Sequence, residues 1–229
     1  MFVGKEVLKT SALDNALDLK QLEGQEVHKI QTYGKQFLLT FDKISVSVHL
    51  MLFGSCLINE KNETRKLRLG LEFDNGEVNF YASNVKFIDG PLEKHYDWSV
   101  DVLSPNWNPV AALEKLNRLH NTKICDALLD QNIFAGVGNK IKDEILFIAK
   151  VHPECIVENI PDEVKMKLAT EAASFSYKYL EWKRTEVQDE NFKVHWKQTC
   201  PRDGTSLLKP KLGTNKRTTY HCPVCQVKY

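Results

Sequence analysis

The 229-residue sequence lacks an apolar run long enough to cross a membrane, because a long apolar stretch such as Ile44 to Ile58 is interrupted by Ser, His and Gly. Its first residues also lack the charged region, apolar core and small-residue cleavage site of a secretory signal. Internal repeats and low-complexity segments are absent. With 42% hydrophobic residues, the chain is expected to be a globular protein of the cytoplasm, or of the nucleus if its source is eukaryotic.

A large net charge is absent too, since the whole chain carries only +1. The charges are unevenly distributed, however. From Lys193 onward there are eight basic residues and one acid, Asp203, which gives +7 and leaves −6 for the first 192 residues. A basic C-terminal segment on a mildly acidic body predicts a polyanionic partner. A merely solvated tail is the alternative, but the interleaved Cys, Gly and Tyr residues indicate that this segment folds.

Alternating apolar and polar residues predict an antiparallel β-sandwich or barrel in the N-terminal part of the chain. Asn75-Gly76 favours a type I′ turn in one of its hairpins. From Asn108-Pro109 onward the spacing becomes helical, with Pro109 at a first helical position. The fold class is therefore α+β with several domains, expected at residues 1–105, 106–192 and 193–229. The expected strands are residues 27–33, 35–41, 44–50, 55–59, 66–73, 77–82 and 85–88, and further helices are expected over 124–129, 140–149 and 162–182.

A turn with two glycines separates the helices expected at 124–129 and 140–149. Gly136 and Gly138 permit positive φ angles and a close approach of the backbone to a ligand. Asn139 then begins a helix, whose unpaired N–H groups and dipole favour a phosphate. Most turns of this kind only connect packed helices, so this feature by itself does not identify a binding site.

Cysteine is scarce, and three of the six cysteines follow the spacing of a metal site. Cys200-Pro-Arg-Asp203 and Cys222-Pro-Val-Cys225 form two knuckles that suit a structural Zn²⁺ ion, with Asp203 at the usual second cysteine position. Since a carboxylate oxygen can bind zinc, all four of these residues are expected ligands. A water or His221 as fourth ligand, or no metal, are the alternatives. The other three cysteines fit no pairing pattern, and a reducing compartment disfavours disulfides.

Two segments of the sequence resemble one protein family. The run Leu-Leu-Asp-Gln-Asn-Ile-Phe-Ala-Gly-Val-Gly-Asn, residues 128–139, resembles the helix-two-turns-helix motif of the formamidopyrimidine-DNA glycosylase and endonuclease VIII family, and the match continues to Val151-His-Pro153. Arg217-Thr-Thr-Tyr-His-Cys-Pro-Val-Cys-Gln226 is similar to the C-terminal zinc finger of that family. The resemblance implies an N-terminal antiparallel β-sandwich, a helix-two-turns-helix domain and a zinc-ribbon β-hairpin.

The resemblance also implies roles for residues of the two C-terminal domains. Asn139 is expected to contact a DNA phosphate, with Gln131, Gly136 and Gly138 shaping the loop before it. Arg217 matches the arginine of the finger that contacts DNA, and its guanidinium suits bidentate phosphate binding. An exposed, solvated arginine is the alternative.

Two further matches lie in the expected strands. Tyr33-Gly-Lys35 resembles a strand of the family in which the lysine lies close to the phosphate of the lesion, although Lys35 can also be an ordinary surface lysine. His49-Leu-Met-Leu-Phe-Gly54 resembles the segment whose apolar side chain fills the gap left by a flipped base. Leu52 stands at the usual methionine position of that segment. A buried strand end is the alternative for Leu52.

The implied function is base excision repair by a bifunctional DNA glycosylase, which removes oxidised bases and cleaves the DNA strand at the resulting abasic site. The implied partner is double-stranded DNA with damaged bases or abasic sites, bound by a monomer that has no contact with membranes and is associated with the nucleoid or located in the nucleus. In this family the amine of an N-terminal proline attacks C1′ of the nucleotide, and an adjacent glutamate transfers protons.

No catalytic residue can be identified on that pattern, because the sequence begins Met1-Phe-Val-Gly4 and its first proline is Pro91. Three explanations remain open, in this order: an incomplete coding sequence, a non-catalytic binder of damaged or abasic DNA, or another amine such as that of Met1 or Lys35. A zinc-ribbon protein that binds structured RNA is a further alternative, which leaves the glycine turn unexplained.

These absences predict that the 229-residue chain binds abasic or oxidised DNA without forming a covalent bond to it. Borohydride reduces a protein–DNA Schiff base to a stable adduct, which a denaturing gel resolves, and we expect no such adduct. Extension of the chain with a segment of the family that begins Met-Pro-Glu should restore trapping. Efficient trapping of the chain without this extension would contradict the prediction and direct attention to Met1 and Lys35.

Overall fold

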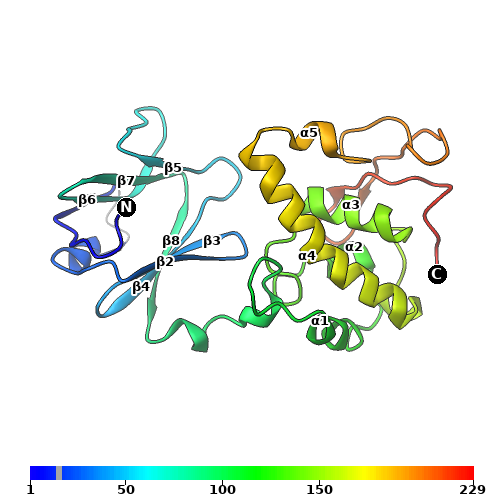
Figure 1. Cartoon of the computed structure of the whole chain (residues 1–229), viewed down its shortest axis with the longest axis horizontal. Helices are drawn as coiled ribbons and strands as arrows, with labels where there is room; N and C mark the ends of the chain where they lie inside the picture. Colours follow the sequence, from blue (N-terminus) through cyan, green and yellow to red (C-terminus); the bar gives the residue numbers. More distant parts are fainter. Residues whose placement is uncertain (14–16) are drawn as a thin grey trace. The chain divides into compact units, whose positions relative to one another are not determined.

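The computed structural model describes residues 1–13 and 17–229, which form two compact units, residues 1–96 and 97–229 (Figure 1). The first unit contains strands β1 to β8, and the second contains the α-helices and the C-terminal β-hairpin. The division into three domains, with residues 193–229 as a domain of their own, stays a prediction.

The first unit is an antiparallel β-sandwich, as the sequence predicts. Its two four-stranded sheets have the orders β2-β3-β4-β8 and β1-β6-β7-β5. Alternating residues of both sheets, such as Val46, Val48, Leu69 and Leu71, are buried in one shared core. The strands are β1 (Lys9–Ser11), β2 (Lys29–Tyr33), β3 (Gln36–Thr40), β4 (Ile44–His49), β5 (Ser55–Ile58), β6 (Leu67–Phe73), β7 (Gly76–Tyr81) and β8 (Asn84–Asp89).

Two details of the predicted sandwich are wrong. Lys35 lies with Gly34 in the two-residue turn between β2 and β3, and not on a strand. The β6–β7 turn is not type I′, because that turn needs positive φ angles at both central residues and neither Asp74 nor Asn75 has one. The positive φ belongs instead to Gly76, at 141°, where a β-carbon would lie 2.2 Å from the side-chain oxygen of Asn59. The conformation of this turn therefore goes together with a close contact between Gly76 and Asn59.

The second unit is built on α-helices, namely α1 (Pro109–Leu116), α2 (Ile124–Ala127), α3 (Asn139–Ala149), α4 (Asp162–Arg184) and α5 (Gln188–Asn191). The start of α1 is as predicted: the side chain of Asn108 accepts hydrogen bonds from the N–H groups of Val110 and Ala111, at 3.0 and 3.3 Å, and Pro109 follows it. Among the residues described, no helix combines the length and the apolar character needed to cross a membrane.

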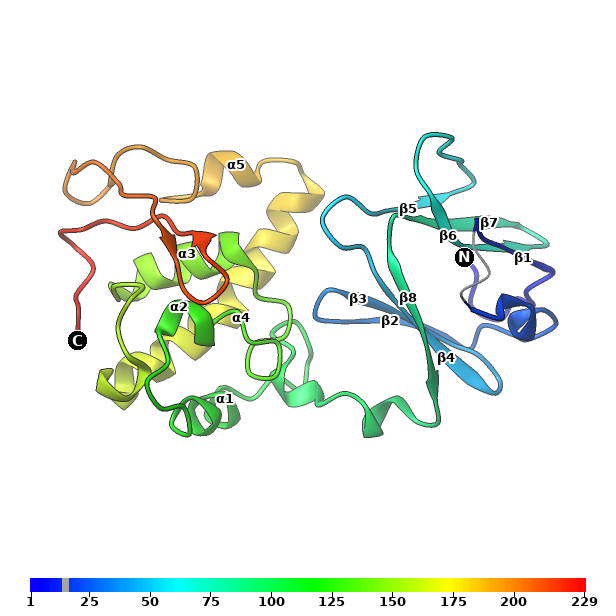
Figure 2. The same cartoon turned by 180° about the vertical axis from the view of Figure 1, so that it is seen from behind.

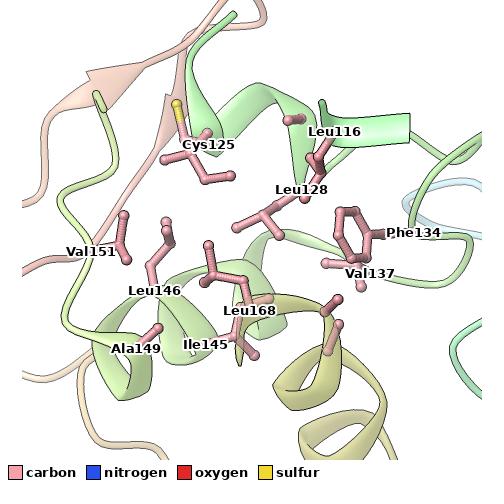
Figure 3. Packing of buried hydrophobic residues seen from close by; sticks show 14 of the residues in the cluster. Leu116, Cys125, Leu128, Phe134, Val137, Ile145, Leu146, Ala149, Val151 and Leu168 are labelled. Carbon is pink, nitrogen blue, oxygen red and sulfur yellow. The ribbon is translucent and has the colours of Figure 1, made fainter. Parts of the chain in front are cut away.

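Helix α3 is the central helix of this unit. It packs against α4, and Ile145, Leu146 and Leu168 belong to the core that Figure 3 shows. Strands β9 (Lys211–Leu212) and β10 (Arg217–Thr218) form the C-terminal hairpin, which lies beside the start of α3 (Figure 2). Eight of the eleven residues of α3 are buried, so the helix is enclosed on nearly all sides.

Candidate DNA-binding face and metal centre

The turn before α3 is held together by the side chain of Gln131. Its Nε2 atom donates hydrogen bonds to the carbonyl groups of Leu129 and Val137, at 2.8 and 3.1 Å. Its Oε1 atom accepts a hydrogen bond from the N–H group of Gly136 at 3.1 Å, and Gly136 has a φ of +102°. Both ends of the Gln131 amide thus brace the turn, which supports the implied loop-shaping role.

The start of α3 presents unpaired N–H groups. Gly138 is the N-cap residue, in an extended conformation and with no side chain to cap the helix. The first intrahelical bond runs from the N–H group of Lys142 to the carbonyl oxygen of Gly138, at 2.9 Å. The N–H groups of residues 139–141 therefore have no carbonyl partner one turn earlier, and the positive end of the helix dipole lies at the same place. This arrangement suits an anion.

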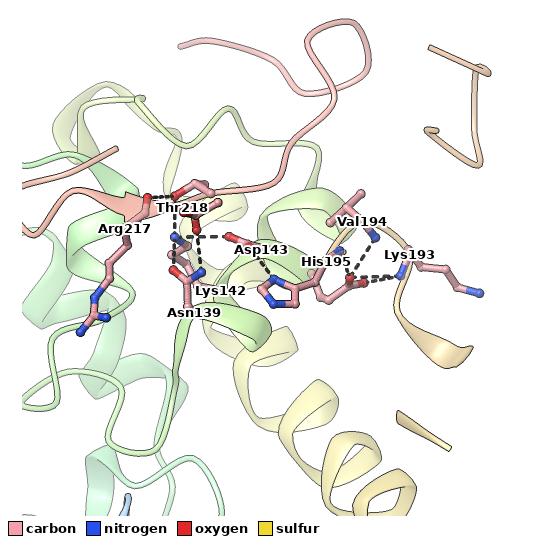
Figure 4. A network of polar contacts seen from close by, with 10 residues as sticks. Asn139, Lys142, Asp143, Lys193, Val194, His195, Arg217 and Thr218 are labelled. Carbon is pink, nitrogen blue, oxygen red and sulfur yellow. Dashed lines mark hydrogen bonds and ion pairs between the residues drawn. The ribbon is translucent and has the colours of Figure 1, made fainter. Parts of the chain in front are cut away.

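Asn139 is bonded to the C-terminal hairpin. Its Nδ2 atom donates a hydrogen bond to the carbonyl oxygen of Thr218 at 2.6 Å, and Lys142 donates one to its Oδ1 atom at 2.8 Å (Figure 4). Arg217, which directly precedes Thr218, is exposed, and its guanidinium makes no ion pair with any residue that the structure describes. Asn139 and Arg217, the two residues expected to contact phosphate, therefore lie on adjacent segments of one compact unit.

A buried cluster of charges continues from this point along α3. Lys142 is only 1% exposed, and its Nζ atom lies 3.3 Å from Oδ1 of Asp143. The other carboxylate oxygen of Asp143 lies 2.7 Å from Nδ1 of His195. Glu144 accepts hydrogen bonds from the backbone N–H groups of residues 193–195 at 2.8 to 3.0 Å. Burial raises the pKa of the Glu144 carboxyl, and the three backbone donors act in the opposite direction.

Sequence reasoning missed this cluster, although one signal for it exists. Lys142 precedes Ile145 by three residues and Ala149 by seven, so the helical period places it on the apolar face of α3. A lysine on that face is seldom fully buried unless it has polar partners. Thr219, the partner of Lys142, is 77 residues away in the sequence, and His195, the partner of Asp143, is 52 residues away, so no local pattern identifies them.

Four predicted metal ligands lie together in the C-terminal segment. The ligand atoms of Cys200, Asp203, Cys222 and Cys225 are all within 4.8 Å of one another. Sγ of Cys222 is 3.3 Å from Oδ2 of Asp203, and the sulfur atoms of Cys200 and Cys225 are 3.8 Å apart. The backbone N–H group of Thr205 lowers the pKa of Asp203 to about 2, so this carboxyl is an anion at neutral pH. Three thiols and one carboxylate form a donor set that can hold a metal ion.

His221, the alternative fourth ligand, is not part of this cluster. Its ring packs edge-on against the ring of His152, with the centroids 4.8 Å apart. Burial lowers the pKa of His221, which is therefore neutral at physiological pH. The geometry thus favours Asp203 over His221 beside the three cysteines.

The first knuckle is attached to the C-terminal end of α3 by Arg202, which sequence reasoning did not single out. Its Nη1 atom donates a hydrogen bond to the carbonyl oxygen of Phe147 at 2.7 Å, and its guanidinium lies 3.8 Å from the centre of the Phe147 ring. The cation therefore lies at the negative end of the helix dipole. Phe147 also packs against Cys200 and Cys222, so the candidate metal centre and α3 share one small core.

Lys35 and Leu52 lie at the same end of the sheet β2-β3-β4-β8. The register pairs Gln36, next to Lys35, with His49, next to the loop that contains Leu52. Leu52 is 81% exposed, so the alternative of a buried strand end is wrong. Its neighbours Met51 and Phe53 are exposed as well. The loop after β4 thus presents three consecutive apolar side chains to solvent.

Met1 lies at the other end of this unit. Its carbonyl oxygen accepts a hydrogen bond from Asn75 at 3.0 Å, in the turn before β7. Lys35 and Leu52 belong to the opposite end, because His49 pairs with Asn84, which follows β7 by three residues. A strand of this length spans about 20 Å, so the structure does not bring the amine of Met1 together with Lys35 or Leu52.

Comparisons with known proteins agree with this geometry. The family model of the formamidopyrimidine-DNA glycosylase N-terminal domain matches residues 2–88, and that of the H2TH domain of the same enzyme matches residues 99–190. The structure is similar to that of the Lactococcus lactis formamidopyrimidine-DNA glycosylase bound noncovalently to DNA with an AP site, with a TM-score of 0.86, 23% identity and coverage of 99% of this chain and 94% of the other.

The curated relatives are named as endonuclease 8-like proteins and formamidopyrimidine-DNA glycosylases. The sequence is 26% identical over 234 residues to the endonuclease 8-like 3 protein of Mus musculus, covering 96% of this chain but 39% of that protein. It is 29% identical over 235 residues to a formamidopyrimidine-DNA glycosylase of Ureaplasma parvum, covering 90% and 84% of the two chains. The chain thus spans less than half of the length of the endonuclease 8-like 3 relatives. Together, the two domain matches, the relatives and the shared fold show that the chain belongs to the formamidopyrimidine-DNA glycosylase and endonuclease VIII family.

Proposed function

We propose that this chain binds double-stranded DNA at damaged bases or abasic sites, as a component of base excision repair. The observation that carries the proposal is the hydrogen bond between Asn139 and Thr218, because it holds the start of α3 beside Arg217. A phosphate at this position meets the N–H groups of the helix, the Asn139 amide and a guanidinium. Gly138 adds no side chain that would obstruct its approach.

Phosphate contacts of this kind position a protein on DNA without reading its sequence. The +7 charge of residues 193–229 supports such binding, because neutralised phosphates release their condensed cations. The hairpin brings Arg217 from this basic segment to the start of α3, so the charge lies beside the proposed phosphate site.

In the first unit, we assign Leu52 to the gap that an extruded base leaves in the stack. An exposed apolar side chain on a short loop can enter that gap and lose its contact with water. Arg65 supports the loop, because its guanidinium donates a hydrogen bond to the carbonyl oxygen of Phe53 at 2.6 Å. Lys35, at the same end of the sheet, is assigned to the phosphate backbone near the lesion.

Glycosylase and abasic-site lyase activity toward oxidised bases is the second candidate function. The observation that favours it is the match of residues 2–88 to the N-terminal domain of the family. Of the amines of Met1 and Lys35, only that of Lys35 shares an end of the sandwich with Leu52. An assisting role in this chemistry therefore belongs to Lys35 rather than to Met1.

We propose that the C-terminal centre holds one Zn²⁺ ion with Cys200, Asp203, Cys222 and Cys225 as ligands. A zinc ion in such a closed tetrahedral site stabilises the fold and leaves no position for a substrate. Burial raises the pKa of Cys222 to about 12, so this thiol needs a bound cation to become a thiolate at neutral pH. The ion would fix the knuckles and, through Arg202, the C-terminal end of α3.

The binding proposal predicts different salt dependences for the two contacts. Arg217→Ala should weaken binding to every duplex and reduce the slope of log K against log salt by about one phosphate contact, because it removes a cation. Asn139→Ala should weaken binding with little change of slope, because it removes a neutral donor. The matched control is Lys209→Ala, which removes another exposed cation of the same segment and should lower affinity and slope less than Arg217→Ala does. Fluorescence anisotropy across a salt series measures both quantities. If Arg217→Ala has the same affinity and the same salt slope as wild type, the binding proposal is wrong.

The assignment of Leu52 predicts a loss of preference for damaged DNA. Leu52→Ala should lower the affinity for abasic duplex about tenfold to a hundredfold while binding to intact duplex changes little, because burial of a leucine side chain contributes about 1.5–3 kcal/mol and each 1.4 kcal/mol is about tenfold. Ile58→Ala is the matched control, since Ile58 is an exposed aliphatic residue at the other end of the sandwich. Competition between the two duplexes measures the preference. Equal losses on both duplexes, or in both variants, would contradict the assignment.

The metal proposal predicts about one zinc per purified chain. Asp203→Cys should slow the loss of zinc to a chelator, because a thiolate is the more usual ligand, whereas Asp203→Ala should accelerate it. Elemental analysis and the rate of release to a colorimetric chelator measure these effects. Identical release from all three proteins would show that Asp203 is not a ligand.

A further inference from the structure

The amide of Asn139 lies between two groups of opposite hydrogen-bonding character. The ammonium of Lys142 has only donors, and it lies 2.8 Å from Oδ1. The carbonyl oxygen of Thr218 has only acceptors, and it lies 2.6 Å from Nδ2. A rotated amide would place a donor against the ammonium and an acceptor against the carbonyl. The two partners therefore select one of the two amide orientations (Figure 4).

We infer that Lys142 is a positioning residue of the phosphate site: it fixes the Asn139 amide so that one N–H bond of Nδ2 stays available to a DNA phosphate. Nδ2 carries two hydrogens, and Thr218 takes one of them. Because Lys142 holds Oδ1, the part of the Asn139 amide that remains available to an anion is the second N–H bond of Nδ2, which is a donor. This inference rests on the proposed function, since it assigns the part of Asn139 that meets DNA.

Lys142 cannot act by touching DNA, because it is 1% exposed. Its ammonium donates hydrogen bonds to Oδ1 of Asn139 and to Oγ1 of Thr219, the latter at 2.7 Å, and forms an ion pair with Oδ1 of Asp143 at 3.3 Å. The buried charge is therefore both hydrogen-bonded and balanced by a carboxylate. Its influence on DNA must therefore pass through the residues that it holds.

The same ammonium also acts on the second phosphate contact. Thr219, which accepts from Lys142, donates its hydroxyl hydrogen to the carbonyl oxygen of Arg217 at 3.0 Å. Lys142 thus fixes the Asn139 side chain directly and the Arg217 backbone through one hydroxyl. A single buried lysine would keep the neutral donor and the cation in register with one stretch of DNA backbone.

A double-mutant cycle tests whether Lys142 acts through Asn139. We expect Lys142→Met and Asn139→Ala each to weaken binding to abasic duplex about tenfold, the size of one lost hydrogen bond to a charged group. The double variant should bind about as well as the weaker single variant, because the second change removes a group that is already misplaced. Asn139→Ala should keep the salt slope of wild type, because it removes a neutral group. Additive losses, or wild-type affinity of Lys142→Met, would overturn the inference.

A milder pair of variants covers the case in which Lys142→Met does not fold. Thr219→Val removes the hydroxyl at nearly constant volume, and Thr219→Ser keeps it. We expect Thr219→Val to weaken DNA binding severalfold and Thr219→Ser to bind like wild type, with thermal unfolding as the check that both are folded. Equal affinities of the two variants would count against the inference.

Side-chain amide NMR provides a readout that needs no DNA. In the free protein, the Asn139 signals, assigned by their loss in Asn139→Ala, should show one proton protected from exchange and one exposed. In Thr219→Val the two protons should exchange at more similar rates. Two exposed protons in wild type would refute the fixed orientation. If wild type does not bind abasic duplex at all, the proposed function fails, whereas wild-type binding with an additive cycle removes only the role of Lys142.

Discussion

The second unit depends on the burial of three consecutive charged residues, Lys142, Asp143 and Glu144, in the middle of its central helix. Lys142 is bonded to the hairpin, whereas Asp143 and Glu144 are both bonded to residues 193–195. A buried charged group that loses its hydrogen-bonding partner costs about 1–3 kcal/mol or more, so these segments have one strongly preferred position. The C-terminal region is therefore attached to α3 by charges as well as by apolar packing.

The two ends of α3 have different chemical surroundings. The N-terminal end, with its unpaired N–H groups, Asn139 and the nearby Arg217, has the character of an anion site. The C-terminal end is bonded to Arg202 of the first knuckle, and Phe147 packs against two of the cysteines. A metal ion that stabilises the knuckles would thereby also stabilise the helix that carries the proposed phosphate site. The candidate metal centre and the proposed phosphate site are thus connected through α3.

The β-sandwich contributes a different kind of surface, in which exposed apolar side chains lie near cations. Met51, Leu52 and Phe53 form the tip of the β4–β5 loop, and Lys35 occupies a turn at the same end of the sheet. Exposed apolar groups gain most when a partner removes them from water. A gap in a base stack, flanked by phosphates, matches this combination of apolar and cationic groups.

The sequence by itself determined the elements and the chemistry of individual residues: strand alternation, the Asn108-Pro109 helix start, the glycine turn before Asn139 and the spacing of the metal ligands. Each of these features is recognised from a few neighbouring residues, including the spacings Cys200 to Asp203 and Cys222 to Cys225 within the two knuckles. Only the tertiary structure decided that Lys35 lies in a turn, that Leu52 is exposed, and that Lys142 holds Asn139 and Thr219 together. Such facts depend on contacts between residues as many as 79 positions apart, and burial and amide orientation are set by those partners rather than by sequence neighbours.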